Sequence, residues 1–392
     1  MSTQNPVFIP GPTNIPERLR RACDNPTIDH RSTAFPALLA PVLGGVREVL
    51  KTTEGEAIVF PGTGTAGWEA AISNTLSPGD GVLAARHGMF SHRWIEMCRR
   101  HGLEVDQVDA AWGAGTPVAE FGAALAADRE HRLKAVLVTH NETSTGVRSD
   151  VAAVRRALDE ADHPALLLVD GVSSIASMDF RMDEWGVDVA VTGSQKGFML
   201  PAGLAILGVS PKALAAMESA RLPRCFLDLR EMREANAAGS YPYTPPMNLL
   251  IGLGESLRML LREEGLDEVF ARHRRTAEGV RRAVAAWELP LCAEDPEQYS
   301  DTVSAIVVPE GFDGSALVDH AAARYGVAFG AGLGDVAGKI FRIGHLGSLT
   351  EVMVLAGLGC AEMAMADLGL PVELGSGVAA AQEYYRSAEP AG

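Results

Sequence analysis

Up to about residue 210, short apolar runs alternate with longer stretches of helical pattern, and this alternation restricts the possible folds more than any other feature. Most of the runs are apolar at consecutive positions, as in strands that are covered on both faces. Spacers of helix length suit crossovers between parallel strands. The pattern therefore predicts an α/β fold with a mainly parallel sheet. Its strands are expected at 57–60, 82–85, 135–139, 165–169, 187–192 and 204–209, and its helices at 67–76, 92–101, 118–127 and 150–160, the last capped by Ser149 or Asp150.

From about residue 248 the pattern changes, because two long helical stretches, 248–264 and 266–287, follow one another directly. Short strands are then expected near 302–308, 327–329 and 340–343, followed by a helix at about 349–368 and at most a short helix after Pro371. We predict a smaller C-terminal α+β domain. The predicted division is an N-terminal segment (1–20), a large domain (21–255) and a small domain (256–392).

The composition restricts the partners of this protein. The 392-residue chain is 47% hydrophobic and 21% charged, as in ordinary globular proteins. Its 34 basic and 50 acidic side chains give a net charge of -16, which repels nucleic acids and anionic lipid. The sequence shows neither the pattern of a signal peptide nor an apolar window of roughly 18 residues. These features predict a cytoplasmic protein that would capture an anionic substrate with local cations.

The cysteines and histidines show no metal-binding pattern. There is no CxxC pair, no HExxH sequence and no Cys/His cluster. We therefore predict no metal site, and structural roles as small buried side chains for the five cysteines, Cys23, Cys98, Cys225, Cys292 and Cys360.

A GxGxxG sequence at 62–67 follows one expected strand and opens an expected helix. Glycines allow a ligand to approach the backbone, and a helix N-terminus offers free N–H groups, so the pattern suits a phosphate. A nicotinamide-binding fold would carry an acidic residue about twenty positions on. The strand at 82–85 leads instead into Arg86 and His87. A nucleotide site and a tight turn without a ligand both stay open as alternatives.

Two further residues, Asp170 and Lys196, stand just beyond expected strand ends. A carboxylate at the end of a buried parallel strand lies where open α/β sheets bind ligands, and it needs either a cation or a capping role. Lys196 has glycine and apolar neighbours, which argues against an ordinary exposed lysine. Desolvation favours its neutral amine, which condenses with aldehydes. A phosphate cradle, an acid for a ring nitrogen and such an amine are the three anchors that pyridoxal phosphate requires.

The sequence also resembles the class V, fold-type I aminotransferases, in particular the branch that uses glyoxylate with aspartate, serine or alanine. This resemblance implies the fold of fold-type I pyridoxal-phosphate-dependent transferases, with a mainly parallel seven-stranded sheet in the large domain. The motifs that carry it span nearly the whole chain: Gly11-Pro-Thr-Asn, Asp29-His-Arg, Gly62-Thr-Gly-Thr, His140-Asn-Glu-Thr-Ser-Thr-Gly, Val169-Asp-Gly-Val-Ser-Ser, Gly193-Ser-Gln-Lys, Tyr241-Pro-Tyr-Thr-Pro and Phe341-Arg-Ile-Gly-His-Leu-Gly.

The resemblance further implies roles for single residues. Lys196 would be the Schiff-base lysine and proton shuttle, and Asp170 would pair with the pyridinium nitrogen. Arg342 would grip the substrate α-carboxylate, with Arg31 a candidate for a distal carboxylate. The remaining cofactor contacts would come from Gly64, Thr65 and Gln195 at the phosphate, Phe90 stacked on the ring, Thr143 near its phenolic oxygen, and Tyr241 and Thr244 from the neighbouring subunit of a homodimer. The sequence does not decide whether Glu142 is buried or solvated.

The implied reaction is ping-pong transamination from L-aspartate to glyoxylate, which gives oxaloacetate and glycine. Serine or alanine as the donor is an alternative, because relatives that use serine carry a similar Asp-His-Arg run. A pyridoxal lyase of the cysteine desulfurase type would need a reactive cysteine near the site, and Cys225 and Cys360 have no activating neighbours in sequence. A non-catalytic dimeric scaffold would make the intact Lys196, Asp170 and Arg342 a coincidence.

Overall fold

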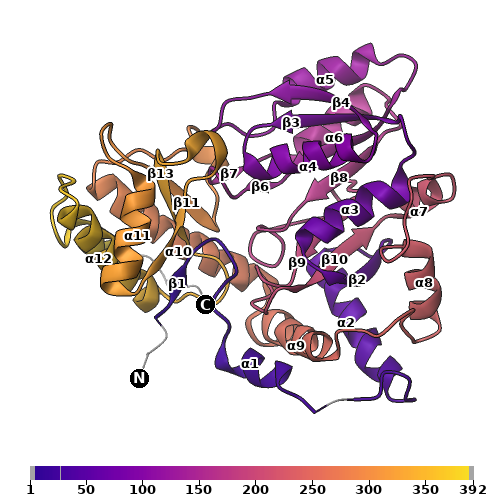
Figure 1. The fold of residues 1–392 in the computed structure, drawn as a ribbon, viewed down its shortest axis with the longest axis horizontal. Coiled ribbons are helices and arrows are strands. Elements are labelled where there is room, and N and C mark those ends of the chain that lie inside the picture. The colour runs from indigo at the N-terminus through magenta and orange to yellow at the C-terminus, as the bar shows by residue number, and fades with distance from the viewer. Residues whose placement is uncertain (1–4, 27, 388–392) are drawn as a thin grey trace.

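A seven-stranded sheet forms the centre of the larger part of the molecule (Figure 1). The structure is a computed structural model that describes residues 5–26 and 28–387. All neighbours in this sheet are parallel except at β10, which runs antiparallel to both β2 and β9. The predicted α/β class and mainly parallel sheet are confirmed. The strand order is β2 (Glu56–Gly62), β10 (Gly203–Val209), β9 (Val189–Gly193), β8 (Leu166–Asp170), β5 (Leu133–Thr139), β3 (Gly81–Arg86) and β4 (Glu104–Asp109).

Six of these strands coincide with the apolar runs of the sequence, and β4 does not. Strand β4 lies at the edge of the sheet, pairs only with β3 and is half exposed along its length. Its sequence, EVDQVD, has no consecutive apolar residues. A strand that is left half exposed at the edge needs none, whereas β2, at the opposite edge, is buried and has one.

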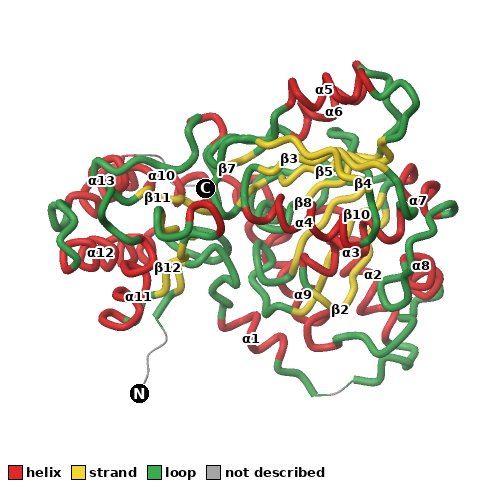
Figure 2. Tube along the Cα trace, turned by 45° about the horizontal axis from the view of Figure 1, so that its top comes forward, coloured by secondary structure: helices red, strands yellow, loops and turns green. Residues whose placement is uncertain are grey.

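Helices cover both faces of the sheet (Figure 2), with α5 (Val118–Ala127) and α6 (Val151–Glu160) on one side and α3 (Gly64–Thr75) and α4 (Met89–Arg100) on the other. The Asp150 carboxylate caps α6, accepting the Ala153 N–H at 2.8 Å, so the second of the two predicted caps is the one used. Helices α3 and α4 each begin three residues before the predicted position. Consequently Gly64, Thr65 and Phe90 lie in first helical turns.

The remaining helices of the larger part pack around the sheet or carry connections. Helices α1 and α2 both contact α9, which continues into a π-helical turn at Met259–Glu264. Their bounds are α1 Glu17–Cys23, α2 Phe35–Val49, α7 Pro211–Met217, α8 Leu229–Ala237 and α9 Met247–Arg258.

The smaller part contains a four-stranded sheet of order β1 (Val7–Phe8), β12 (Ala328–Ala331), β13 (Ile340–Gly344) and β11 (Val303–Val307). Strand β1 comes from the N-terminal segment and pairs in parallel with β12. Helices α11 (Gly314–Tyr325), α12 (Glu351–Asp367) and α13 (Ser376–Ser387) complete this α+β part. Helix α10 (Leu266–Ala286) joins the two cores, because Val269 belongs to the larger one and Val280 to the smaller. The division at residues 20 and 255 stays a prediction.

The five cysteines differ in burial and form no disulfides. Cys98 and Cys292 are buried, whereas Cys225 is exposed, so the expectation of a buried side chain is wrong for Cys225. No helix within the described residues is long and apolar enough to cross a lipid bilayer.

Candidate active site

Lys196 lies just beyond β9 and is buried, with 8% of its surface exposed. Its Nζ donates a hydrogen bond to the Pro10 carbonyl oxygen, and a Cβ at Gly11 would overlap the lysine side chain. The N-terminal segment therefore covers this amine. The pKa of Lys196 is lowered to about 8, mainly by burial and also by the nearby Arg342 charge, while the Asp170 charge opposes both effects. The neutral, nucleophilic form is thus accessible near neutral pH.

Asp170 is the last residue of β8 and is 4% exposed. Its Oδ1 accepts the Val172 N–H at 2.9 Å. Burial raises the pKa of Asp170 to about 7, and the charge of Glu142 adds to this increase. The Trp68 indole lies near enough to favour the charged carboxylate without meeting hydrogen-bond geometry. A cation placed beside Asp170 would restore its charge, as a protonated ring nitrogen does.

The start of α3 provides an anion-binding cradle. The side chain of Thr63, which precedes the helix, accepts no hydrogen bond from the first N–H groups of α3, so these groups are free. Gly64 is buried, and a Cβ there would overlap Val172. Buried polar atoms without partners lie close in sequence to Lys196: Thr192 Oγ1 and Gln195 Oε1. Buried polar groups are ordinarily paired, so these orphaned atoms and free N–H groups fit a bound phosphate group.

Phe90 stands in the first turn of α4, half-buried against the tryptophan side chains of α3 and α4. Its ring meets Trp68 edge-on, with centroids 6.5 Å apart, and Trp68 stacks on Trp94 at 5.8 Å. Trp68 is a further site residue that the motifs do not identify, although it stands one helical turn after Gly64 on α3.

Arg342 on β13 brings a buried guanidinium from the smaller part of the molecule to the larger. Its Nε donates to the Ala331 carbonyl and its Nη1 to the Thr143 carbonyl, each at 3.0 Å. Burial lowers the pKa of Arg342 to about 10, and the charge of Glu142 opposes that decrease. Within the described residues, no carboxylate lies at ion-pair distance from Arg342. Its charge is therefore available to a substrate carboxylate.

Thr143 is held beside the end of β8 by its hydroxyl, which donates to Ser173 Oγ at 2.7 Å. The structure thus brings the predicted group around Lys196 together from six segments of the chain. These residues are Gly64, Phe90, Thr143, Asp170, Gln195, Lys196 and Arg342, with Thr65 exposed at the cradle rim.

The structure does not join Arg31, Tyr241 or Thr244 to this group. Arg31 is exposed between α1 and α2, and its side chain makes no hydrogen bond or ion pair within 5–26 and 28–387. Tyr241 is buried in the large core, where its hydroxyl donates to the Val59 carbonyl. Thr244 is exposed. Their roles toward a neighbouring subunit stay predictions.

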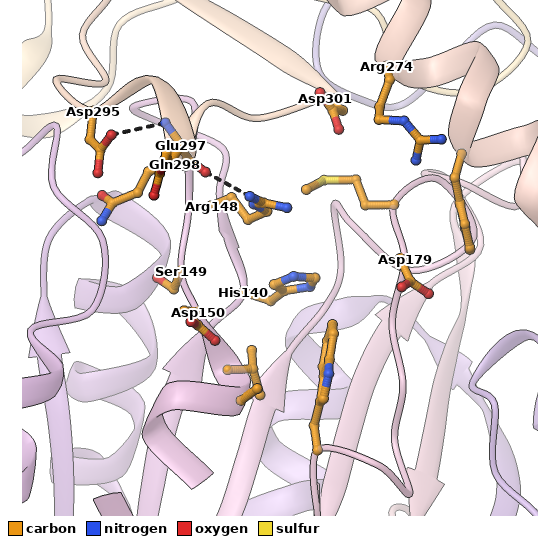
Figure 3. Close-up of a pocket in the computed structure, with 15 residues that line it drawn as sticks. His140, Arg148, Ser149, Asp150, Asp179, Arg274, Asp295, Glu297, Gln298 and Asp301 are labelled. Carbon is orange, nitrogen blue, oxygen red and sulfur yellow. Dashed lines mark hydrogen bonds between the residues drawn. The ribbon is translucent and has the colours of Figure 1, made fainter. Parts of the chain in front are cut away.

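A separate cavity of about 480 Å³ lies between the two parts of the molecule, and Figure 3 shows His140 within it. Its lining includes none of Lys196, Asp170 and Arg342. Burial lowers the pKa of His140 to about 3, and its Nδ1 is paired with Ser174 Oγ at 2.9 Å. Asp150 in the lining is already used as the α6 cap. This cavity is therefore not the centre of the predicted chemistry.

A family model described as Aminotransferase class-V matches residues 25–341. The chain belongs to this family. Over 386 residues it is 66% identical to a protein of Paracoccus denitrificans named L-aspartate--glyoxylate aminotransferase, covering 98% of this chain and 97% of that relative. It is 55% identical to the serine--glyoxylate aminotransferase of Hyphomicrobium methylovorum, covering 97% and 94%. The crystal structure of pyridoxamine-pyruvate aminotransferase from Mesorhizobium loti superposes with a TM-score of 0.91 at 28% identity, covering 98% of both chains.

Family membership confirms three predictions from the sequence: the fold type, transamination as the chemistry, and pyridoxal 5'-phosphate as the cofactor. The lyase, nucleotide-binding and scaffold alternatives are set aside. The residues present fit this cofactor: the uncapped N-terminus of α3 would hold its phosphate, the buried Asp170 would pair with its ring nitrogen and the buried amine of Lys196 would react with its aldehyde.

The lowered pKa of Lys196 predicts how cofactor attachment depends on pH. We expect the rate of covalent attachment to the cofactor-free aminotransferase to rise with pH and to level off above about 8, because only the neutral amine reacts. Stopped-flow absorbance at the imine band, recorded between about pH 6 and 10, measures this rate. A rate still rising near pH 10.5 would show an unshifted lysine.

Proposed function

We propose that this aminotransferase transfers the amino group of L-aspartate to glyoxylate, forming oxaloacetate and glycine by a ping-pong mechanism. The observation that carries the proposal is the 66% identity, over nearly the full length, with the relative named for aspartate and glyoxylate. The relative named for serine is 55% identical, which supports serine as the alternative donor. Glyoxylate as the acceptor is common to both names.

The residues of this chain divide the work of the reaction. Pyridoxal phosphate, when bound, supplies an electron-withdrawing ring that weakens the bonds at the donor Cα. Arg342 binds the α-carboxylate and orients Cα, with two of its N–H groups already fixed by carbonyl oxygens. The amine of Lys196 removes the proton at Cα and returns it at C4' of the cofactor. Asp170 keeps a proton at the ring nitrogen.

Burial prepares these groups for their roles. Lys196, Asp170 and Arg342 are all less than 9% exposed, so little water competes for the proton or for the carboxylate. A base is most effective when its pKa lies near the working pH, and the pKa of Lys196 is lowered to about 8. We propose that Gly64, Thr65 and Gln195 bind the phosphate while Phe90 and Thr143 contact the ring.

A half-reaction panel tests the donor. The purified yellow enzyme is mixed separately with aspartate, serine, alanine and glutamate while the imine band is followed. We expect aspartate to bleach the band fastest, with the colour restored by glyoxylate. Faster bleaching by serine would overturn the choice of aspartate and leave transamination itself intact.

We propose that Arg31 binds the distal carboxylate of aspartate. Its exposed side chain makes no hydrogen bond or ion pair in the part of the chain that the structure describes, so its charge is free. Arg31→Gln should raise KM for aspartate about tenfold and leave KM for serine unchanged, because serine has no second carboxylate. Equal changes for both donors would contradict this role.

Arg342→Lys is expected to raise KM for donor and acceptor roughly tenfold while changing kcat less, since lysine carries the charge without the bidentate fork. Steady-state kinetics with each substrate measure this. Arg262→Lys is the control, because Arg262 forms an exposed ion pair with Glu48. A normal KM in Arg342→Lys would remove Arg342 from the carboxylate site.

We propose a homodimer in which Thr244 and Tyr241 serve the partner's cofactor phosphate. The exposed Thr244 hydroxyl supports this role, whereas the Tyr241 hydroxyl must leave the Val59 carbonyl to take part. Sedimentation of the holoenzyme gives the oligomeric state. Thr244→Val should weaken cofactor binding in the dimer, and a monomeric active enzyme would refute the shared site.

A further inference from the structure

The N-terminus of α4 carries Phe90 but has no cap of its own. The preceding residue is Gly88, which has no side chain that could accept the free N–H groups. Ser144 Oγ accepts the Met89 N–H at 2.9 Å. The N–H groups of Phe90 and Ser91 point to the Glu142 carboxylate, at 3.1 and 2.9 Å from Oε2. Glu142, at the end of the short strand β6 (Asn141–Glu142), and Ser144 just after it therefore supply the cap from a distant part of the chain.

Glu142 is fully buried, with 0% of its surface exposed. Its Oε1 also accepts the Ser144 hydroxyl at 2.6 Å and the Ser144 N–H at 3.1 Å. A Cβ at Gly88 would overlap the Glu142 carboxyl group, so the glycine allows the carboxylate to reach the helix. Four donated hydrogen bonds and a positive helix end offset the cost of burying this carboxylate.

The residue that follows β6 also contacts two other parts of the site. Thr143, next to Glu142, donates a hydrogen bond from its hydroxyl to Ser173 Oγ. The Thr143 carbonyl oxygen accepts a hydrogen bond from Arg342 Nη1. The Glu142 charge acts on Arg342 and Asp170, as the pKa values of both residues reflect. Glu142 can therefore affect the site without itself binding the substrate or the cofactor.

We propose that Glu142 is a positioning residue that fixes Phe90 against the cofactor ring by capping α4 from outside the helix. The inference rests on the proposed placement of Phe90 at the ring. Without the carboxylate, the first turn of α4 would lose the acceptor for two N–H groups, and the Phe90 backbone would shift. A misplaced ring would then stack less well on the cofactor.

A double-mutant cycle tests whether Glu142 acts through Phe90. Glu142→Gln keeps the size of the side chain but places an amide NH2 group against backbone N–H donors. We expect it to weaken cofactor affinity about tenfold and to change the visible circular dichroism of the bound cofactor. In the Phe90→Leu background the same substitution should weaken affinity less than about twofold, because the ring it positions is gone.

The outcomes separate the possible failures. If Phe90→Leu alone leaves affinity unchanged, the placement of Phe90 is wrong. If Phe90→Leu weakens binding but Glu142→Gln costs the same in both backgrounds, Glu142 does not act through Phe90 and the inference is overturned. Should Glu142→Gln fail to fold, Ser144→Ala replaces it in the cycle, since Ser144 Oγ links Glu142 to the Met89 N–H.

A matched control separates capping in general from capping at the site. Asp150 also caps a helix with a carboxylate, but it caps α6 and lies beside the separate cavity. Asp150→Asn should lower thermal stability and leave cofactor affinity and circular dichroism unchanged. A change in the cofactor signals equal to that of Glu142→Gln would show that any helix-cap loss produces them, and would also overturn the inference.

Discussion

Lys196→Ala is expected to lower kcat by about 10² to 10⁴, the contribution typical of a positioned general base. The substitution removes the amine that moves the proton between Cα and C4' and leaves the other cofactor contacts in place. Cofactor binding should therefore persist without a covalent bond. Single-turnover absorbance with aspartate measures the rate of proton transfer, and borohydride reduction followed by mass spectrometry shows whether the cofactor is attached.

The proton-transfer role of Lys196 can be separated from its covalent role by chemical rescue. A small primary amine added to Lys196→Ala should restore part of the rate in proportion to its neutral fraction, since it can diffuse into the vacated space. Lys134→Ala is the control, because Lys134 is exposed on β5. Turnover of Lys196→Ala within about tenfold of the wild type would contradict the assignment of this lysine as the base.

The central sheet and the residues at its strand ends were predictable because their signal is local. Consecutive apolar residues mark strands that are covered on both faces, and the ends of parallel strands meet at one edge of a sheet. Asp170 ends β8 and Lys196 follows the adjacent strand β9, so their proximity is a consequence of strand order. The GxGxxG turn was likewise visible, although the start of α3 at Gly64 was placed three residues too late.

The features that the sequence did not reveal depend on long-range contacts. The sequence around Glu142 does not show whether its side chain is solvated or buried. The N–H groups that it caps belong to Phe90 and Ser91, which are distant in sequence. The pairing of β1 with β12 joins segments more than three hundred residues apart, and a strand of two residues carries no recognisable sequence pattern. Strand β4 was missed because it is half exposed and lacks an apolar run, whereas the other edge strand, β2, is buried and carries one.

Asp170→Asn is expected to lower kcat by about 10² to 10⁴. Breaking a buried charge pair costs about 3–5 kcal/mol, and each 1.4 kcal/mol corresponds to about a factor of ten. The asparagine keeps the size of the side chain but cannot hold a proton at the ring nitrogen by its charge. Stopped-flow bleaching by aspartate measures the loss, and an unchanged rate would exclude Asp170 from this role.

The same substitution should stabilise the cofactor-free protein. Burial raises the pKa of Asp170 from 3.8 to about 7, so the folded state binds this proton more tightly than the unfolded state does. The resulting decrease in the free energy of unfolding is absent below pH 3.8, grows as the pH rises and is complete above about pH 7. At pH 8, cofactor-free Asp170→Asn should therefore be more stable than the wild type by roughly 2–4 kcal/mol. Urea unfolding at pH 5 and pH 8 measures the free energy of unfolding of both proteins. If the stability advantage of Asp170→Asn were smaller at pH 8 than at pH 5, the buried Asp170 carboxylate would not be a destabilising group that is kept for cofactor binding.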